Sequence, residues 1–575
     1  MSRRRYLRRV LLVLTGMAAW TLWLVWRVVD VQVVQASRLD QVASSLHEHT
    51  FVVPAPRGAI LDRHGHVLAL DVPAYEVVAA PTAIAQAAAT VPHLRTREAD
   101  LLARYLPYPA ARIRQALSGH GWYRVLDADL PAPAGAALAR QAGNLPGISV
   151  VPVSRRSYPD GSLAAQVLGF VGADGKGLGG IEYAENAVLA GRPGRWTVAT
   201  DAQGTPLPAW QVSRTAPVPG DDVELTLDSQ VQLIVERALA AAMKTTHAVS
   251  GTVIVMDPAT GAVLALANAP GFNPADVARA SPTALTDWAV EDPVPPGSIF
   301  KPVTAAAALT EGIVTPGTMF DTRGYKIVNG VRINDWNLTG WGWISFAQAF
   351  ALSSDQVFMD LGLKLGVATL YRYIRAFGLM QPSGVGLPGD SNSIFLPASQ
   401  VNAVDLATIA FGQGFAVTPM QMLKAVAAIA NDGTMMEPRI VRAVLAPDGR
   451  VLHRYGPVVA GHPISPAIAA QVQQLMEQEV TSGTGIKAAV PGYVLAGKTG
   501  TAQKVVGGRT SSTRFISSFI GYGPMPHPRF AMLVMINQPV GQYYGGDVAA
   551  PVFGAIARQL LAYWHIPPSA AAPTP

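Results

Sequence analysis

A run of residues without charge extends over Val10–Trp26, directly behind five arginines in the first nine positions. Its length is about the minimum for a helix that crosses a bilayer, and the apolar sequence resumes beyond Arg27. Because arginines accumulate on the cytoplasmic side of membrane helices, we expect a cytoplasmic tail at residues 1–9, a single-pass transmembrane anchor at 10–29, and an extracytoplasmic chain beyond it.

A cleaved signal peptide is the alternative for this segment, since Val34-Gln35-Ala36 resembles a cleavage site. The length of the apolar run and its tryptophans favour an uncleaved anchor in the cytoplasmic membrane. Five of the six formal net positive charges come from the N-terminal arginines. The rest of the chain is nearly neutral, so no binding of nucleic acid is expected.

The chain contains no cysteine, which excludes disulfides, thiolate catalysis and zinc–thiolate sites. The histidine-containing segment His47-Glu48-His49 is predicted to be a solvated stalk, and we expect neither a metal site nor a cofactor. Half of the 575 residues are hydrophobic and 14% are charged, which indicates a folded protein of two to four domains.

Changes in the sequence pattern divide the chain beyond the anchor into segments. A stalk at 30–50, helical over Ser37–His49, is expected to precede a mixed α/β pedestal domain at 51–215. In the pedestal, short apolar runs separated by Pro and Gly predict strands, and residues 81–147, rich in Ala, Leu and Arg, predict helices. The predicted pedestal strands are Phe51–Val53, Ala59–Leu61, Val67–Leu70 and Val150–Val153.

A second domain is expected at 216–566, followed by a low-complexity tail at 567–575 that we expect to be disordered. A strand, a helix and a hairpin precede a mostly helical stretch from Ser298 to about Ala430. More strands and a closing helix follow. This order predicts an α+β domain whose sheet is completed by the C-terminal part. The predicted elements are strand 221–227, helix 229–243, hairpin 251–257 and 262–268, strands 493–497, 515–522 and 530–536, and helix 548–564.

Ser298 and Lys301 stand three apart where the helical stretch begins, after Pro295-Pro296-Gly297. This spacing places both side chains on one face of a helix, where a lysine that is partly neutral can take the proton of the serine hydroxyl. The helix N-terminus directs backbone N–H groups toward developing negative charge. The alternative role of Ser298 is that of a helix N-cap.

Two further motifs combine hydroxyls with charged groups. Ser353-Ser354-Asp355 follows an apolar segment, and its structural alternative is a helix-terminal turn. Lys498-Thr499-Gly500-Thr501 follows the predicted strand 493–497. At a strand edge, such a cation and two hydroxyls can bind a carboxylate, and Gly500 allows a ligand to approach the backbone. The alternative for this motif is a polar turn.

In combination, S-x-x-K, S-x-D and K-T-G resemble the signature of penicillin-binding proteins. The chain resembles a class B penicillin-binding protein over nearly its full length, most closely the division type. The resemblance implies a serine β-lactamase-like transpeptidase domain with a central antiparallel sheet flanked by helices, behind a dimerisation-type pedestal. Further matching segments are Pro56–Arg63, Arg156–Pro159, Gly177–Glu182, Gly412–Gly414, Thr418–Gln421 and Tyr544–Gly546.

The resemblance also implies an activity, that of a peptidoglycan D,D-transpeptidase. Ser298 is then the nucleophile acylated by the D-Ala-D-Ala end of a stem peptide, and Lys301 is the general base. Ser353 and Asp355 move protons and hold the motif lysines, with Lys498 completing the catalytic set. Asp355 departs from the asparagine that the family often has there and resembles elongation-type members.

The same resemblance assigns substrate binding to the third motif. Thr499 and Thr501 contact the terminal carboxylate beside Gly500, and the N–H groups of Ser298 and Thr501 form an oxyanion hole. The implied partners are peptidoglycan stem peptides, β-lactam antibiotics, the cytoplasmic membrane and a SEDS-type glycosyltransferase docked on the pedestal. Arg57, Asp62, Arg156 and Glu182 are predicted to form polar links within the pedestal, apart from the active site.

Several alternatives for the function stay open. An elongation- or sporulation-type transpeptidase would carry the same motifs, and a D,D-carboxypeptidase would use water as the acceptor. A β-lactam sensor or a non-catalytic scaffold could retain the same fold. A histidine-dependent serine hydrolase is disfavoured because none of the eleven histidines is near the three motifs.

Overall fold

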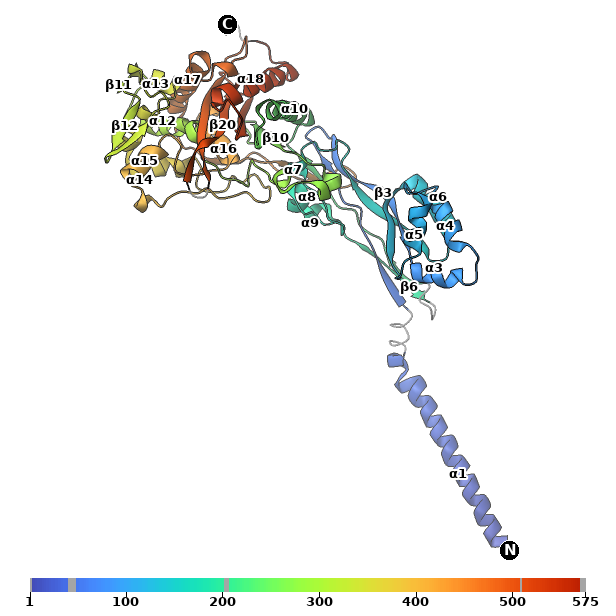
Figure 1. Cartoon of the computed structure of the whole chain (residues 1–575). Helices are drawn as coiled ribbons and strands as arrows, with labels where there is room; N and C mark the ends of the chain where they lie inside the picture. Colours follow the sequence, from blue (N-terminus) through green and yellow to red (C-terminus); the bar gives the residue numbers. More distant parts are fainter. Residues whose placement is uncertain (1–2, 40–47, 201–205, 507–508, 569–575) are drawn as a thin grey trace. The chain divides into compact units, whose positions relative to one another are not determined.

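The computed structural model describes residues 3–39, 48–200, 206–506 and 509–568 (Figure 1). They form two compact units: residues 1–56 with 191–219, and residues 57–190 with 220–575. The predicted stalk helix falls largely on residues 40–47, and the predicted disordered tail on 569–575. Both of these stretches lie outside the described residues.

The first unit contains the apolar N-terminal helix. Helix α1 (Arg3–Val29) continues into a π-helical turn, η1 (Asp30–Val34). Residues Tyr6–Val34 are long and apolar enough to cross a membrane. The unit also has a three-stranded antiparallel sheet in the order β1-β6-β7, formed by β1 (Glu48–Val53), β6 (Gly194–Thr200) and β7 (Pro206–Thr215). The predicted stalk helix was wrong at residues 48–49, since they belong to strand β1 and pair with β6.

The second unit begins with a sheet that combines sequence-distant strands in the order β17-β16-β8-β2-β3-β4, with β5 also paired to β3. Its strands are β2 (Ile60–Leu61), β3 (Val67–Ala79), β4 (Arg124–Pro131), β5 (Ile148–Ser157), β8 (Asp222–Leu225), β16 (Val441–Leu445) and β17 (Val451–Arg454). Strands from the predicted pedestal and from the predicted second domain therefore share one hydrogen-bonded sheet.

Helices α3 to α6 pack their apolar residues against strands β3, β4 and β5 in a separate small core. These helices are α3 (Pro81–Ala88), α4 (Leu94–Leu102), α5 (Ala110–Leu117) and α6 (Ala132–Ala142), and the short helices α7 (Ala165–Leu168), α8 (Gly180–Ala184) and α9 (Asn186–Leu189) follow. The sequence prediction of helices over 81–147 missed β4, which lies between α5 and α6.

A buried ion-pair cluster joins three distant segments of this region. Glu182, fully buried in α8, accepts hydrogen bonds from Arg57 Nε (2.5 Å) and Arg156 Nε (2.6 Å) on its two carboxylate oxygens. Asp62 accepts from Ser229 N and Oγ, where the next helix of the unit begins. The predicted polar links are confirmed: Arg57, Arg156 and Glu182 bond to one another, and Asp62 accepts from His64 N and His66 N within the pedestal as well as from Ser229 beyond it.

A five-stranded antiparallel sheet, in the order β10-β9-β21-β20-β19, lies at the centre of the second domain. It contains β9 (Ser250–Met256), β10 (Val263–Ala269), β19 (Ala496–Val506), β20 (Arg509–Gly523) and β21 (Phe530–Asn537). C-terminal strands β19 to β21 complete the N-terminal hairpin, as predicted. The predicted strand over 493–497 was misplaced: β19 starts at Ala496, so the Lys498 motif lies inside a strand rather than after it.

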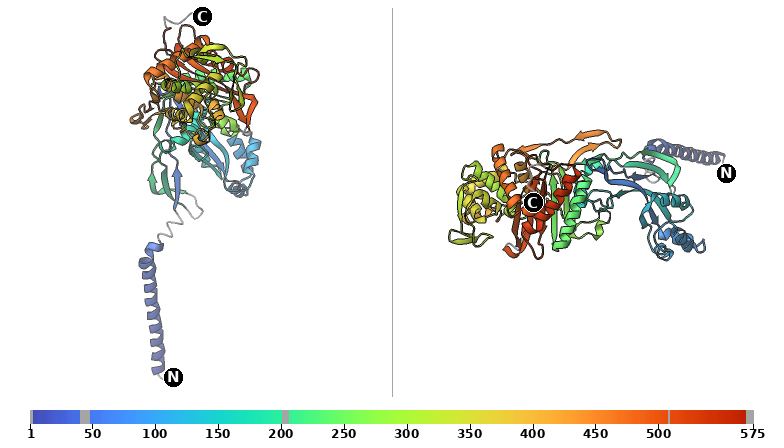
Figure 2. Two further views of the ribbon diagram at one scale, coloured as in Figure 1. Left: turned by 90° about the vertical axis from the view of Figure 1, so that its left-hand side faces the viewer. Right: turned by 90° about the horizontal axis from the view of Figure 1, so that it is seen from above.

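Side chains along β21 alternate between two hydrophobic cores, as strand periodicity requires. Met532 and Val534 pack with α10 (Ser229–Thr246) and α18 (Gly545–Tyr563) on one face of the sheet. Leu533 and Met535 belong to the larger core on the other face. The green α10 and red α18 lie side by side in Figures 1 and 2.

The larger core also contains the helical region that was predicted from Ser298 to Ala430. The helices between residues 274 and 488 are η2 (Pro274–Arg279), α11 (Pro282–Leu285), η3 (Gly297–Phe300), α12 (Lys301–Thr310), α13 (Phe346–Ala351), α14 (Asp355–Ala376), η4 (Ala398–Gln400), α15 (Ala403–Ile409), α16 (Pro419–Ala430), α17 (Pro466–Ser482) and η5 (Ile486–Ala488). Of these, η2 and α11 contribute to a separate small core, and η5 contributes to the core around α10 and α18. The prediction missed two small β pairings: β11 (Met319–Thr322) with β14 (Gly342–Ser345), and β12 (Tyr325–Val328) with β13 (Val331–Asn334). A third short pair joins β15 (Met435–Met436) to β18 (Val459–Gly461).

Candidate active site

Ser298 lies in the 3₁₀ turn η3 that leads into α12, and its side chain is half-buried. The cap positions of the two helical segments are Pro296 and Phe300, and neither makes a side-chain cap bond. Ser298 is therefore not a helix cap. The preceding Gly297 has φ +60° and donates its N–H to Gly412 O at 2.9 Å, which fixes the entry of the chain into this turn.

Lys301, the first residue of α12, connects this turn with the second motif. Its ammonium is fully buried and donates hydrogen bonds to Ser353 O (2.8 Å), Ser353 Oγ (3.1 Å) and Asp355 Oδ1 (2.6 Å). Three acceptors around one Nζ fix the position of the lysine side chain. The structure thus brings Lys301, Ser353 and Asp355 together as the sequence predicted.

Of the three residues in the second motif, one caps a helix and two face the site. Ser354 is the N-cap of α14, accepts from Val357 N and donates to the buried Asp335 carboxylate at 2.7 Å. Ser353 has a left-handed backbone, with φ +57°, and turns its carbonyl and hydroxyl toward Lys301. The alternative of a helix-terminal turn is therefore right for Ser354, while Ser353 and Asp355 face the site.

Asp355 has lost most of its contact with water, and burial raises its pKa. The neighbouring Lys301 opposes this shift because its positive charge favours the carboxylate. At 2.6 Å the two groups form an ion pair, so the aspartate of the second motif is the counter-ion of the lysine of the first.

Lys498, on the edge strand β19, is the second fully buried lysine. Its Nζ lies 2.9 Å from Glu479 on α17 and 3.3 Å from Thr499 Oγ1. Burial lowers the pKa of Lys498 to about 8, and the Glu479 carboxylate opposes this shift. The motif is brought to the site as predicted, but its closest counter-ion is a residue that the sequence analysis missed.

Glu479 could have been found from helical periodicity. It follows Val472 and Met476 at i+7 and i+3, so a carboxylate falls on the apolar, buried face of a predictable helix. Carboxylates are rarely fully buried unless they are paired, and this one required a cationic partner.

Thr499 points toward the same carboxylate. Its backbone N–H (2.7 Å) and its hydroxyl (2.9 Å) both donate to Glu479 Oε1, and little of the residue is exposed. The predicted contact of Thr499 with a substrate carboxylate stays a prediction, because in this structure both donors already have a protein acceptor.

Gly500 and Thr501 form the part of the motif that contacts the Ser298 turn and the first residue of α18. A Cβ on Gly500 would lie 2.8 Å from Ile299 Cγ2, so only glycine allows this approach. Thr501 Oγ1 accepts from Gly545 N at 3.0 Å. Since backbone N–H groups alternate along a strand, and that of Thr499 points away from β20, the N–H of Thr501 lies on the same free edge.

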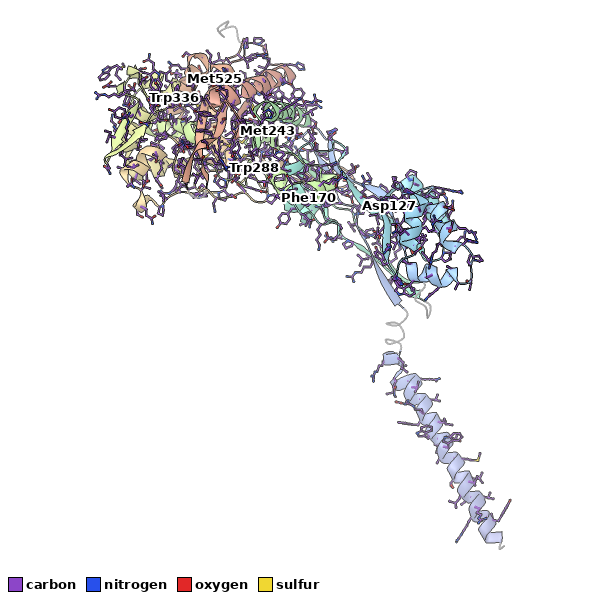
Figure 3. All side chains as sticks on the ribbon, viewed as in Figure 1. Asp127, Phe170, Met243, Trp288, Trp336 and Met525 are labelled. Carbon is purple, nitrogen blue, oxygen red and sulfur yellow. The ribbon has the colours of Figure 1, made fainter. Side chains whose placement is uncertain are left out.

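Two exposed aromatic side chains lie beside the motifs. Trp336, labelled in Figure 3, donates its indole N–H to Leu352 O at 3.1 Å, next to Ser353. Tyr544 precedes Gly545, and the two ring centroids are 6.3 Å apart. The sequence analysis missed Trp336; its place in a loop carries no periodic signal.

Comparisons with known proteins agree with this geometry. Residues 251–558 match the penicillin binding protein transpeptidase domain, and residues 52–225 match the penicillin-binding protein dimerisation domain. The chain belongs to the class B penicillin-binding proteins. The predicted family and fold class are confirmed, and so is the D,D-transpeptidase function that goes with this family.

Curated and solved relatives of this class B penicillin-binding protein cover almost the whole chain. It is 33% identical to stage V sporulation protein D of Bacillus subtilis over 92% of this chain and 82% of that protein. It is 31% identical to the peptidoglycan D,D-transpeptidase FtsI of Escherichia coli K12 over 95% and 90%. The crystal structure of penicillin binding protein 3 from Mycobacterium tuberculosis, complexed with aztreonam, has 29% identity and a TM-score of 0.70, with 91% of this chain and 99% of that one covered.

Proposed function

We propose that Ser298 is the acylated nucleophile of a peptidoglycan D,D-transpeptidase, and that the three motifs act in the roles expected from the sequence. The observation that carries this proposal is the position of Lys301. It begins the helix that follows the Ser298 turn, and its ammonium is bonded to both Ser353 and Asp355. One buried cation therefore couples the serine turn to a second hydroxyl and a carboxylate.

In the proposed reaction, Lys301 first passes a proton to Asp355 across their 2.6 Å hydrogen bond and becomes a neutral general base. Ser298 Oγ then attacks the penultimate D-alanine carbonyl of a stem peptide while Lys301 Nζ takes the hydroxyl proton. The N–H groups of Ser298 and Thr501 stabilise the oxyanion. Collapse of the tetrahedral intermediate breaks the peptide bond, and the terminal D-alanine leaves as an amine after it receives a proton by way of Ser353.

The acyl-enzyme is then attacked by an amine from a neighbouring strand, which forms the cross-link and restores the Ser298 hydroxyl. Lys498 supplies positive charge for the terminal carboxylate of the donor peptide, and Thr499 and Thr501 complete that contact beside Gly500. A β-lactam acylates the same serine, but its acyl group stays attached and blocks the site.

We further propose the arrangement of the chain at the membrane. Residues 10–29 are the anchor, 1–9 remain in the cytoplasm, and the pedestal at 51–215 and the catalytic domain at 216–566 lie outside. The arginines before the apolar run support this orientation. The pedestal and anchor would dock a SEDS-type glycosyltransferase. Photo-crosslinkers placed at single sites within Phe51–Thr215, followed by co-purification, would test this contact. Crosslinks to unrelated proteins alone would contradict it.

Labelling of the full-length protein with fluorescent penicillin, followed by peptide mapping, tests the nucleophile. We expect a single adduct on Ser298 that is absent from Ser298→Ala. Ser281→Ala is a matched control, since Ser281 caps the separate short helix α11 and should label normally. An adduct on another residue, or no adduct in folded protein, would refute the proposal.

A second assay identifies the acceptor. The purified protein receives lipid-linked glycan polymer from a partner polymerase, and the products are separated after muramidase digestion. Cross-linked dimers that disappear in Ser298→Ala support the transpeptidase. Release of D-alanine without dimers would favour the carboxypeptidase, and acylation by penicillin without any product would favour a sensor or scaffold.

A further inference from the structure

Glu479 is a fully buried carboxylate at the third motif, and it collects several donors. Lys498 Nζ and Thr499 N donate to its Oε1 at 2.9 and 2.7 Å, and the hydroxyl oxygens of Thr499 and Thr484 lie 2.9 and 3.0 Å from the same atom. The two hydroxyls are 2.6 Å apart and each carries one proton, so with the Thr499 hydroxyl bonded to Glu479 the Thr484 hydroxyl donates either to Thr499 or to Glu479. A carboxylate with this number of donors is held in one orientation.

The charged groups around Lys498 come from three helices. Glu479 approaches from α17, Lys301 from α12 and Asp355 from α14, and the ring of Phe350 on α13 lies 5.9 Å from the ammonium. Lys301 and Asp355 form their own pair at 2.6 Å. Two buried ammonium groups and two carboxylates, of which the Asp355 side chain is 17% exposed, therefore form two ion pairs, and Glu479 is the counter-ion of Lys498.

We propose that Glu479 is a positioning residue that holds Lys498 as a charged, correctly oriented ammonium during acylation. The proposal rests on the role of Lys498 proposed above. A lysine removed from water favours its neutral form, and a carboxylate in contact with it favours the charged form. Without Glu479, Lys498 would lose its closest carboxylate and deprotonate at lower pH, which removes the positive charge that attracts a substrate carboxylate.

Glu479 also holds the strand that carries the motif. It is the acceptor for the Thr499 N–H on the free edge of β19, two residues before the N–H of Thr501. A purely structural role would end there and would lower stability without changing how activity depends on pH. The pH dependence of acylation therefore separates a positioning role from a structural one.

The test measures the rate of Ser298 acylation by fluorescent penicillin in the full-length protein between pH 5.5 and about 9.5, for the parent chain and Glu479→Gln. Glutamine keeps the shape and an acceptor oxygen but removes the charge. The parent should lose activity as Lys498 deprotonates, near its pKa of about 8. In Glu479→Gln this alkaline limb of the pH–rate profile should move down by at least about one pH unit. The rate at pH 8 should then fall to about one-eleventh of the variant's own maximum, whereas the parent at pH 8 keeps about half of its maximum.

Glu477→Gln is the matched control, since Glu477 lies on the same helix and makes no side-chain hydrogen bond to the three motifs within the described residues. Its alkaline limb should coincide with that of the parent. Glu479→Asp keeps the charge on a side chain one methylene shorter, so its limb should fall between those of the parent and Glu479→Gln.

The positioning role would be overturned if the alkaline limb of the pH–rate profile stays at the parent position in Glu479→Gln and only the overall rate or the stability falls. If Glu479→Gln does not fold, Glu479→Asp decides: a limb moved toward lower pH supports the role, and an unmoved limb overturns it. Absence of Ser298 labelling in the parent chain would instead refute the proposed function itself.

Discussion

Glu182 offers a test of how buried charge holds the pedestal segments together. It is fully buried, and the side chains of its partners Arg57 and Arg156 are 5% and 3% exposed. If Glu182 becomes glutamine, Arg156 keeps Asp71 at 3.2 Å, but Arg57 keeps only neutral acceptors such as Asn186 Oδ1 at 2.8 Å. One buried guanidinium is then left without a carboxylate.

Loss of one partner from a buried ion pair costs about 3–5 kcal/mol. Because glutamine preserves the volume of the side chain, this cost reports the charge rather than a cavity. Each 1.4 kcal/mol corresponds to a factor of ten. Amides of the paired strands β3 and β5 that exchange through opening of this region should therefore exchange about two to four orders of magnitude faster in Glu182→Gln.

Native-state hydrogen–deuterium exchange with peptide mass spectrometry, on the full-length protein in detergent, measures this directly. Asp174→Asn is the control, since Asp174 forms an exposed pair with Lys176 and its loss should leave the exchange of β3 and β5 unchanged. Exchange in Glu182→Gln within about threefold of the parent would refute the reasoning, because the buried charges would then contribute little net stability.

Three further substitutions test separate parts of the molecule. Burial raises the pKa of Glu98 to about 7, so the free energy of unfolding falls as pH rises from the ordinary carboxyl range through 7 and Glu98 ionises. Glu98→Gln should therefore raise the urea midpoint at pH 8 but not at pH 4.5. An equal gain at both pH values would contradict this. In Gly500→Ala the new Cβ would lie 2.3 Å from Ser518 Oγ and would displace the adjacent Ser298 turn, so fluorescent penicillin should acylate Ser298 about 100-fold more slowly. Gly143→Ala is the control, because there is open space around its Cβ and labelling should be normal. Asp355→Asn should lower the acylation rate and move the alkaline limb of the pH–rate profile to lower pH, but by less than Glu479→Gln does. The reason is that Asp355 favours the charged form of Lys498 but is itself bonded to Lys301. A larger shift than in Glu479→Gln would contradict the assignment of Glu479 as the main counter-ion of Lys498.

Local periodicity was sufficient for three strands of the central sheet, because β9, β10 and β21 are buried on both faces and have mainly apolar sequences, whereas β19 was misplaced. It was also sufficient for α10 and α18, whose apolar stripes face that sheet. The hairpin β12–β13 was missed although its turn carried a signal. Asn329 and Gly330 both have positive φ, as a two-residue turn between Val328 and Val331 requires, and Asn-Gly between apolar residues is typical of such a turn.

Strand β4 had no comparable signal. Its sequence, Arg124–Pro131, is largely exposed and is defined by its pairing with β3, a contact between segments about fifty residues apart. The same limit applied to the site. The motifs predicted Lys301, Ser353 and Asp355 as one group, but pairing Glu479 with Lys498 needs the packing of α17 against β19, which one-dimensional periodicity cannot supply.

The positions of the Asp355 and Glu479 carboxylates change how the third motif is interpreted. The sequence left Asp355 available to either lysine, whereas the structure gives Asp355 to Lys301 and Glu479 to Lys498. Glu479 also takes both donors of Thr499, so the first half of the motif is bonded inside the protein. Gly500 and Thr501 contact the Ser298 turn and Gly545 instead. A substrate carboxylate at this strand would therefore meet Thr501 directly, while Lys498 would act on it mainly through its charge, and Thr499 could reach it only by exchanging its hydroxyl bond with Glu479.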